Sequence, residues 1–218
     1  MKPHFDPARF QSTPLIGIVR HADALDHRAF IDAVLAGGLT TLEVSFTHPD
    51  AAAHLAQLHA AAGGRLNLGA GAITTVKRLE HALAAGASFI VTPVIATEVL
   101  AACIAADVPI FPGAFTPSEI VTAQTQGATM VKIFPAVALG PAFVAQLKAT
   151  LPELRLLPTG GIALADIPKW RRAGADGLGL GGGLFPAALL AAGAWGELAI
   201  HIRAHVSAWQ TAAPTSSS

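Results

Sequence analysis

Short apolar segments alternate with longer alanine- and leucine-rich segments along almost the whole chain, and this alternation constrains the fold more than any other feature. The short segments are nearly continuously apolar, which is typical of parallel strands that are covered on both faces. The longer segments have helical spacing. The pattern predicts eight strands, at residues 14–20, 41–46, 66–72, 89–95, 109–114, 129–134, 154–159 and 176–181, and eight helices, at residues 26–37, 49–62, 75–85, 97–106, 117–126, 141–150, 164–173 and 187–210.

Eight strand–helix pairs without a linker predict an α/β protein with one (β/α)8 TIM-barrel domain over residues 1–212. Several helices are followed by a glycine, as at Gly86 and Gly127, where a left-handed residue can end a helix before the next strand. An open, doubly wound sheet would show the same alternation, but no Gly-x-Gly-x-x-Gly motif follows the first strand. The small, polar residues 213–218 are expected to be a disordered tail.

Charge and composition exclude several classes of partner. The chain has 14 Lys and Arg against 14 Asp and Glu and shows no basic stripe, so nucleic-acid binding is not expected. No apolar segment is long enough to span a bilayer, and the first residues do not resemble a signal peptide, so no membrane partner is expected. The single cysteine, Cys103, cannot form an intramolecular disulfide. These features predict a cytoplasmic protein.

Three charged residues stand where strands of the predicted barrel end, namely Arg20, Glu43 and Lys132. A charge that loses its hydration in a strand needs a partner or a chemical role. In barrel enzymes the catalytic groups lie at the carboxyl ends of strands, and strand alternation allows Glu43 and Lys132 to face the barrel axis. A lysine amine can attack a ketone, an arginine can bind a carboxylate and a glutamate can move protons. Together they indicate Schiff-base chemistry on a 2-oxo acid.

A structural ion pair buried in the barrel is the alternative explanation of these charges. The other lysines fall in predicted helices or near the amino terminus and are expected to be solvated; they are Lys2, Lys77, Lys148 and Lys169.

Two glycine clusters follow the last two predicted strands, Thr159-Gly160-Gly161 after the seventh and Gly179-Leu180-Gly181-Gly182-Gly183 after the eighth. In this fold the loops after these strands often bind phosphate through backbone N–H groups. Tight turns between strand and helix would also use glycine. The occurrence of both clusters at these two positions favours a phosphate site.

The histidines do not predict a metal centre, because no His, Cys and carboxylate spacing suits one. His21 and His48 lie in loops at the catalytic end and could touch a ligand. Five others are expected to be surface residues of helices, namely His54, His59, His81, His201 and His205. No Gly-x-Ser-x-Gly motif offers a serine nucleophile.

The order and spacing of five short motifs resemble those of one enzyme family, the aldolases for 2-keto-3-deoxy-6-phosphogluconate and 2-keto-3-deoxy-6-phosphogalactonate. The resemblance extends from Leu15 to about Phe185. It rests on Leu42-Glu43-Val44, Gly69-Ala70-Gly71, Pro112-Gly113, Val131-Lys132-Ile133-Phe134-Pro135 and Pro158-Thr159-Gly160-Gly161.

The resemblance implies that Lys132 forms the Schiff base and that Glu43 is the general acid and base. Arg20 is similar to an arginine of the phosphogalactonate branch, whereas the phosphogluconate branch carries an arginine at the position of Thr47. Thr159 is similar to the phosphogluconate branch. The resemblance as a whole is closer to the phosphogalactonate branch. The implied substrate-binding residues are Arg20, Ala72, Phe134, Thr159, Gly160, Gly161, Gly181 and Gly182.

Two positions depart from the family pattern. Ala72 stands where the family has a threonine that helps to hold the pyruvyl end of the substrate, so Thr74 or Ser45 would have to compensate. Gly182 replaces a serine of the phosphate loop, which removes a hydroxyl group but leaves the backbone N–H groups.

The predicted activity is the cleavage of a 2-keto-3-deoxy-6-phospho sugar acid, of galactonate or gluconate type, to pyruvate and glyceraldehyde 3-phosphate. No metal or organic cofactor is expected, because the lysine iminium withdraws the electrons. The alternatives are an aldolase for an unphosphorylated or different 2-keto-3-deoxy acid, a sugar-phosphate isomerase or epimerase, and a non-catalytic sugar-acid-binding barrel. The resemblance also implies a homotrimer.

Overall fold

The computed structural model describes residues 4–20 and 25–213. Of the predicted tail at residues 213–218, only Ala213 lies within the described residues. None of the described helices is long and apolar enough to cross a membrane.

The described strands pair in parallel and form two sheets. The larger sheet has the order β5-β4-β3-β2-β1-β9 and the smaller one β6-β7-β8. Their bounds are β1 Leu15–Val19, β2 Thr41–Ser45, β3 Asn67–Gly71, β4 Ile90–Val91, β5 Ile110–Phe111, β6 Gly113–Ala114, β7 Val131–Ile133, β8 Leu156–Pro158 and β9 Leu178–Leu180. Every predicted strand segment contains at least one of them, so the predicted parallel α/β architecture is confirmed.

The described strands form sheets of six and three strands, whereas the sequence predicts a single eight-stranded sheet. One division falls at Pro112, which separates β5 from β6. Proline has no N–H group to donate to a neighbouring strand, although its carbonyl oxygen accepts from the backbone N–H of Lys132 at 2.9 Å. The other division lies between β8 and β9, which are joined by an isolated bridge from Thr159 to Gly179.

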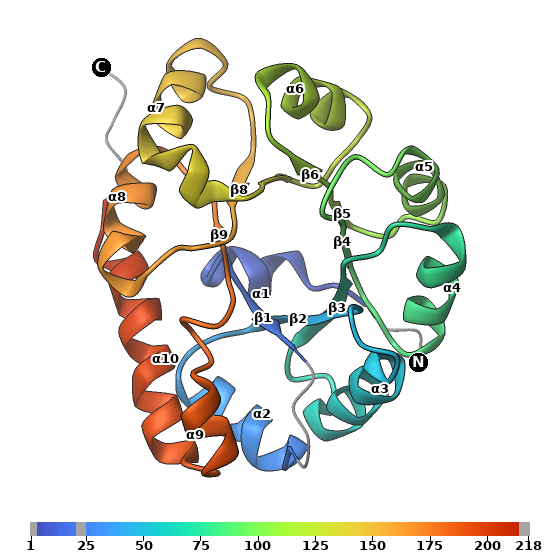
Figure 1. The fold of residues 1–218 in the computed structure, drawn as a ribbon, viewed down its shortest axis with the longest axis vertical. Coiled ribbons are helices and arrows are strands. Elements are labelled where there is room, and N and C mark those ends of the chain that lie inside the picture. Colours follow the sequence, from blue (N-terminus) through green and yellow to red (C-terminus); the bar gives the residue numbers. More distant parts are fainter. Residues whose placement is uncertain (1–3, 21–24, 214–218) are drawn as a thin grey trace.

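Helices cover the outside of the sheets, and Figure 1 shows them surrounding the strands. The α-helices are α1 Pro7–Ser12, α2 His27–Ala36, α3 Ala51–Ala62, α4 Val76–Ala84, α5 Thr97–Ala105, α6 Pro117–Thr125, α7 Gly140–Thr150, α8 Ile167–Arg172, α9 Ala187–Ala191 and α10 Trp195–Gln210, with 3₁₀ turns η1 Ala136–Ala138 and η2 Leu164–Asp166. The single helix predicted at residues 187–210 is therefore two helices. They are separated near Gly193, whose φ of 61° is left-handed.

The sequence prediction missed α1, which closes the end of the fold at the amino ends of the strands. Asp6 caps this helix by accepting from the N–H of Arg9, and Asn67 of β3 exchanges two hydrogen bonds with the backbone of Asp6. Phe10 of α1 packs edge-on against Phe111 of β5, with ring centroids 5.7 Å apart. Phe5, Phe10, Phe89 and Phe111 pack together in this way and fill the interior at the amino ends of the strands.

Three sequence predictions about solvated side chains are wrong. Lys148 forms an ion pair with Asp176 at 2.8 Å and also donates to the carbonyl of Leu154. His54 and His205 are buried, 3% and 1% exposed, because their helices turn those faces toward the core. Helical periodicity identified these helices, but it did not identify which polar residue lies on the buried face.

Candidate active site

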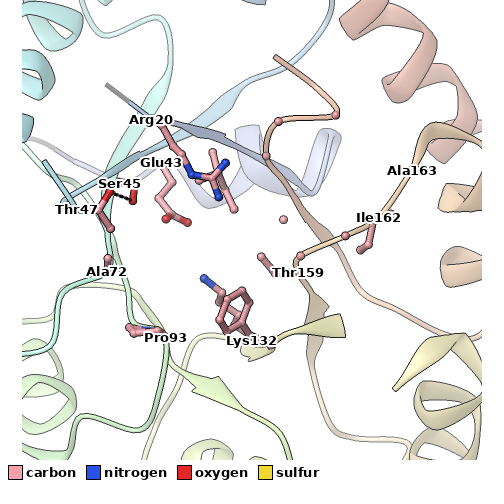
Figure 2. Close-up of a pocket in the computed structure, with 18 residues that line it drawn as sticks. Arg20, Glu43, Ser45, Thr47, Ala72, Pro93, Lys132, Thr159, Ile162 and Ala163 are labelled. Atoms are coloured by element: carbon pink, nitrogen blue, oxygen red, sulfur yellow. Dashed lines mark hydrogen bonds between the residues drawn. The ribbon is translucent and has the colours of Figure 1, made fainter. Parts of the chain in front are cut away.

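A cavity of about 680 Å³ lies at the carboxyl ends of the strands. Figure 2 shows Arg20, Glu43 and Lys132 directed into this space from separate strands. The structure brings together in this one cavity all ten residues to which the sequence analysis gave catalytic or binding roles. They are Arg20, Glu43, Ala72, Lys132, Phe134, Thr159, Gly160, Gly161, Gly181 and Gly182.

Glu43 is in the middle of β2 and is only 3% exposed. Its neighbours Leu42 and Val44 face the helices and are fully buried, so strand alternation directs the carboxyl group to the interior. Burial raises the pKa of Glu43 above its ordinary value, and the positive charges of Lys132 and Arg20 offset part of this increase. A carboxyl group with a raised pKa accepts a proton more readily than one in water, which suits a general acid and base.

Gly71 at the end of β3 leaves the space that the Glu43 carboxyl group occupies. A Cβ atom at position 71 would lie 1.6 Å from Oε1 of Glu43, which is far inside van der Waals contact. The absence of a side chain at Gly71 is therefore a condition for the observed position of Glu43. Sequence reasoning singled out this glycine only as part of a motif.

We expect the substitution Gly71→Ala to displace the Glu43 carboxyl group and to lower turnover about 10²-fold, the typical effect of a misplacement of about 1 Å in an active site. Steady-state kinetics with thermal unfolding would measure both effects. Gly196→Ala is the matched control, because a Cβ atom there meets no atom within 4 Å. Near-normal turnover of Gly71→Ala would show that the position of Glu43 is not critical.

Lys132 is the central residue of β7 and is 6% exposed. Val131 and Ile133 on either side are fully buried against the helices, which directs the lysine to the cavity. Its Nζ atom lies 4.8 Å from the centroid of the Phe134 ring, within the range of a cation–π contact. The amine therefore faces both the Phe134 ring and the open cavity, where a small ketone could approach it.

Arg20 follows β1 and is largely exposed at the mouth of the cavity. Its Nη1 atom would lie 3.7 Å from a Cβ atom at Gly181 and 4.0 Å from one at Gly182. The guanidinium group is therefore beside the glycine loop that follows β9. A phosphate on this loop would meet both backbone N–H groups and a bidentate cation.

The two glycine clusters meet at the same side of the cavity but differ in conformation. Gly160 and Gly161 have left-handed φ angles of 96° and 76°, so other residues would be strained there. Gly179 makes room for Thr159, since a Cβ atom at 179 would lie 2.3 Å from the threonine Oγ1. The hydroxyl of Thr159 donates to the carbonyl of Leu157 at 3.1 Å, which leaves its oxygen available to accept from a ligand.

Ala72 has an unusual backbone conformation. Ala72 has a φ of 59°, and its carbonyl accepts a hydrogen bond from Arg78 at 3.3 Å. Of the two residues predicted to replace the missing hydroxyl, Ser45 lines the cavity and Thr74 does not. Ser45 lies 3.2 Å from the hydroxyl of Thr47, so two hydroxyl groups meet at this edge of the cavity.

The two histidines that were predicted in loops at the catalytic end, His21 and His48, have different outcomes. His48 lines a neighbouring pocket of about 250 Å³, while His21 lies outside the described residues. Residues without a role predicted from the sequence also line the main cavity, among them Ile18, Pro93 and Ala163. Ile18 could have been found, because it is two residues from Arg20 on one strand and so shares its face.

Within residues 4–20 and 25–213, no group of three His, Cys, Asp or Glu residues could hold a metal ion.

Comparisons with known proteins agree on one family. A family model described as "KDPG and KHG aldolase" matches residues 7–200. The chain is 31% identical to the 2-dehydro-3-deoxy-6-phosphogalactonate aldolase of Escherichia coli, over 80% of this chain and 85% of the relative. It is 35% identical to the 2-dehydro-3-deoxy-phosphogluconate aldolase of Pseudomonas aeruginosa, over 72% and 70%.

Solved structures show the same similarity. A structure described as native KDPGal has a TM-score of 0.83 at 30% identity and covers 91% of this chain and 95% of its own. The KDPG aldolase of Legionella pneumophila, with pyruvate captured as a covalent carbinolamine intermediate, has a TM-score of 0.83 at 26% identity and covers 90% and 96%.

Proposed function

We propose that this chain is a class I aldolase that cleaves a 2-keto-3-deoxy-6-phospho sugar acid to pyruvate and glyceraldehyde 3-phosphate. The chain belongs to the KDPG and KHG aldolase family. The observation that carries the proposal is the burial of one lysine and one glutamate in a single cavity, with an arginine and two glycine clusters at its mouth. Reductive trapping tests it: pyruvate and borohydride should together give a stable covalent adduct of the chain, and each alone should not.

The proposed reaction begins at Lys132. Its Nζ atom attacks the ketone carbon of the substrate, and loss of water gives an iminium ion. Glu43, directly or through a water molecule, removes the proton of the hydroxyl group on carbon four. The bond between carbons three and four then breaks, its electrons move to the iminium nitrogen, and glyceraldehyde 3-phosphate leaves. Protonation of the remaining enamine and hydrolysis of the imine release pyruvate and restore the lysine.

The environment of Glu43 suits this role. A buried carboxyl group whose pKa is raised accepts a proton more readily than one in water, and it can return the proton to the enamine. Lys132 and Arg20 provide the positive charges that stabilise the ionised form of Glu43 before the proton moves. The same carboxyl group could therefore serve as base in cleavage and as acid in the release of pyruvate.

The phosphate of the substrate is assigned to the loops after β8 and β9, with Arg20 beside them. Support comes from the open backbone of Gly181, Gly182 and Gly183, which line the cavity, and from the nearby guanidinium. Arg20 was expected from the sequence to bind the carboxylate. Its position beside the β9 loop favours the phosphate instead, and the hydroxyl groups of Ser45 and Thr47 then serve the pyruvyl end.

Gly182→Ser should lower the KM of the phosphorylated substrate about tenfold, since a hydrogen bond to a charged group contributes roughly 1.5–3 kcal/mol. A side chain fits there because the nearest atom to a Cβ at 182 is Nη1 of Arg20, at 4.0 Å. Steady-state kinetics with phosphorylated and unphosphorylated substrates would measure the change. Gly196→Ser, at an exposed position of helix α10, is the matched control. An unchanged KM, or a gain shared by unphosphorylated acids, would contradict the phosphate assignment.

The configuration of the sugar acid is the finer part of the proposal, and we assign it to the galactonate type. Arg20 and the extent of the similarity to the Escherichia coli relative support this choice, whereas Thr159 resembles the gluconate type. A kinetic panel of gluconate- and galactonate-derived acids, each with and without phosphate, would decide it. Higher kcat/KM for unphosphorylated acids would favour the alternative aldolase that Ala72 and Gly182 suggest.

The arrangement of the whole molecule is also part of the proposal. We infer a closed eight-stranded barrel in a single domain, in which β5 and β6 act as one strand around Pro112 and the bridge from Thr159 to Gly179 joins β8 to β9. The homotrimer and the location in the cytoplasm stay predictions from the sequence. Light scattering of the purified protein would test the trimer.

A further inference from the structure

We propose that His201 is a positioning residue, which holds the β9 loop (residues 181–185) in its anion-binding conformation through the carbonyl group of Gly183. The inference rests on the proposed function, because it concerns the loop to which the substrate phosphate is assigned. His201 itself does not line the cavity. Its effect on catalysis would therefore be transmitted through the loop backbone rather than through contact with substrate.

The contact is a short hydrogen bond between α10 and the loop that follows β9. Nε2 of His201, on α10, lies 2.7 Å from the carbonyl oxygen of Gly183. A carbonyl oxygen can only accept, so Nε2 carries the proton in this contact. From the sequence alone, His201 is expected to be an ordinary surface residue of a helix. The residue is partly buried, and its ring reaches from the helix to the loop.

This bond is one of two that hold a single peptide unit of the loop in place. The N–H of Leu184 donates to the carbonyl of Gly181 at 2.9 Å, and the N–H of Phe185 donates to the same oxygen at 3.2 Å. The peptide between Gly183 and Leu184 is thus held at its N–H by the turn and at its C=O by His201. Rotation of this unit would have to break both bonds.

The fixed peptide leaves two donors free for a ligand. In the described part of the chain, the N–H groups of Gly182 and Gly183 have no hydrogen-bond acceptor. The guanidinium of Arg20 lies beside Gly181 and Gly182. Three consecutive glycines have unusually wide conformational freedom, and ordering them on a ligand costs entropy. A bond that orders them beforehand reduces this cost for each binding event.

Helix α10 gives His201 a rigid base. Leu198, Ile202 and Val206 bury one face of the helix in the core. One turn after His201, His205 is 1% exposed, and its Nδ1 donates to the carbonyl of His201 at 2.9 Å. The two imidazole rings are 4.7 Å apart. The buried ring of His205 therefore supports one side of the His201 ring and limits its orientations.

The variant His201→Ala tests the inference by steady-state kinetics. We expect the KM of the phosphorylated substrate and the inhibition constant of inorganic phosphate to rise about five- to tenfold, the effect of one lost neutral hydrogen bond. We expect kcat, and the KM of the unphosphorylated acid, to stay unchanged. His201→Gln keeps an N–H donor of similar reach, so it should restore most of the affinity.

His59→Ala is the matched control, because His59 is also a half-buried helical histidine but lies against Gly86, outside the main cavity. An equal loss for phosphorylated and unphosphorylated acids would overturn the inference, as would a glutamine variant that behaves like alanine. Unchanged phosphate affinity in His201→Ala would also overturn it. If the wild-type chain gives no adduct with pyruvate and borohydride, the proposed function itself fails. An adduct with normal phosphate affinity in His201→Ala removes only the role of His201.

Discussion

Replacement of Lys132 by arginine should abolish both turnover and the covalent capture of pyruvate. Arginine keeps a positive charge beside Glu43, but its guanidinium cannot form the imine that the reaction requires. Loss of a covalent nucleophile typically lowers kcat on the order of 10⁴–10⁶-fold. Turnover assays, together with intact mass after treatment with pyruvate and borohydride, would measure the loss.

The position of the adduct separates Lys132 from the other lysines. Lys77 is exposed on α4, so Lys77→Arg should keep both turnover and trapping and serves as the matched control. Peptide mass spectrometry of the trapped wild-type chain should find the modification at Lys132. An adduct at Lys77, Lys148 or Lys169 would remove Lys132 from the mechanism. Circular dichroism of Lys132→Arg should match the wild type, because the charge next to Glu43 is retained.

Glu43→Gln should lower turnover about 10²–10⁴-fold, the usual contribution of a general acid or base. The amide has nearly the same shape as the carboxyl group but cannot accept the proton of the carbon-four hydroxyl. Formation of the imine between Lys132 and pyruvate should continue, so borohydride trapping should persist at a lower rate. Near-normal turnover would leave Glu43 as a structural partner of the two cations.

The same variant should change how stability depends on pH. Burial raises the pKa of Glu43 above its ordinary value of 4.5, so folding favours the protonated form. The stabilisation is therefore complete below pH 4.5 and decreases as the pH rises through the folded-state pKa, because the unfolded carboxyl group has already released its proton. Glutamine does not titrate. Thermal unfolding should thus show the variant gaining stability relative to wild type as the pH rises above 4.5, and a difference independent of pH would contradict this.

In the proposed mechanism, the position of Glu43 depends on the absence of a side chain at Gly71. A methyl group at position 71 would overlap Oε1 of the glutamate. In the role that we propose for His201, a side chain that does not line the cavity likewise holds part of the site, through the carbonyl group of Gly183. Neither Gly71 nor His201 is a charged residue within an apolar run, so neither was conspicuous in the sequence.

Most of the architecture and of the candidate site could be predicted from the sequence, because both depend on local patterns. The alternation of apolar runs with helical spacing located the strands, and Glu43 and Lys132 were conspicuous as charges within such runs. The period of two along each strand then directed both to the interior, where the structure has them. Parallel strands bring their carboxyl ends to one edge, so residues distant in sequence were expected to meet in one cavity.

Only the tertiary structure decided the contacts that depend on register and on the rotation of each helix. Three such contacts join separate elements of the fold, namely Phe10 of α1 with Phe111, Lys148 with Asp176, and His201 with Gly183. Periodicity locates an element and its faces, but it contains no information about which residues of another element lie opposite. That relation is fixed by side-chain packing over the whole core, which is a property of the folded chain and not of any local pattern.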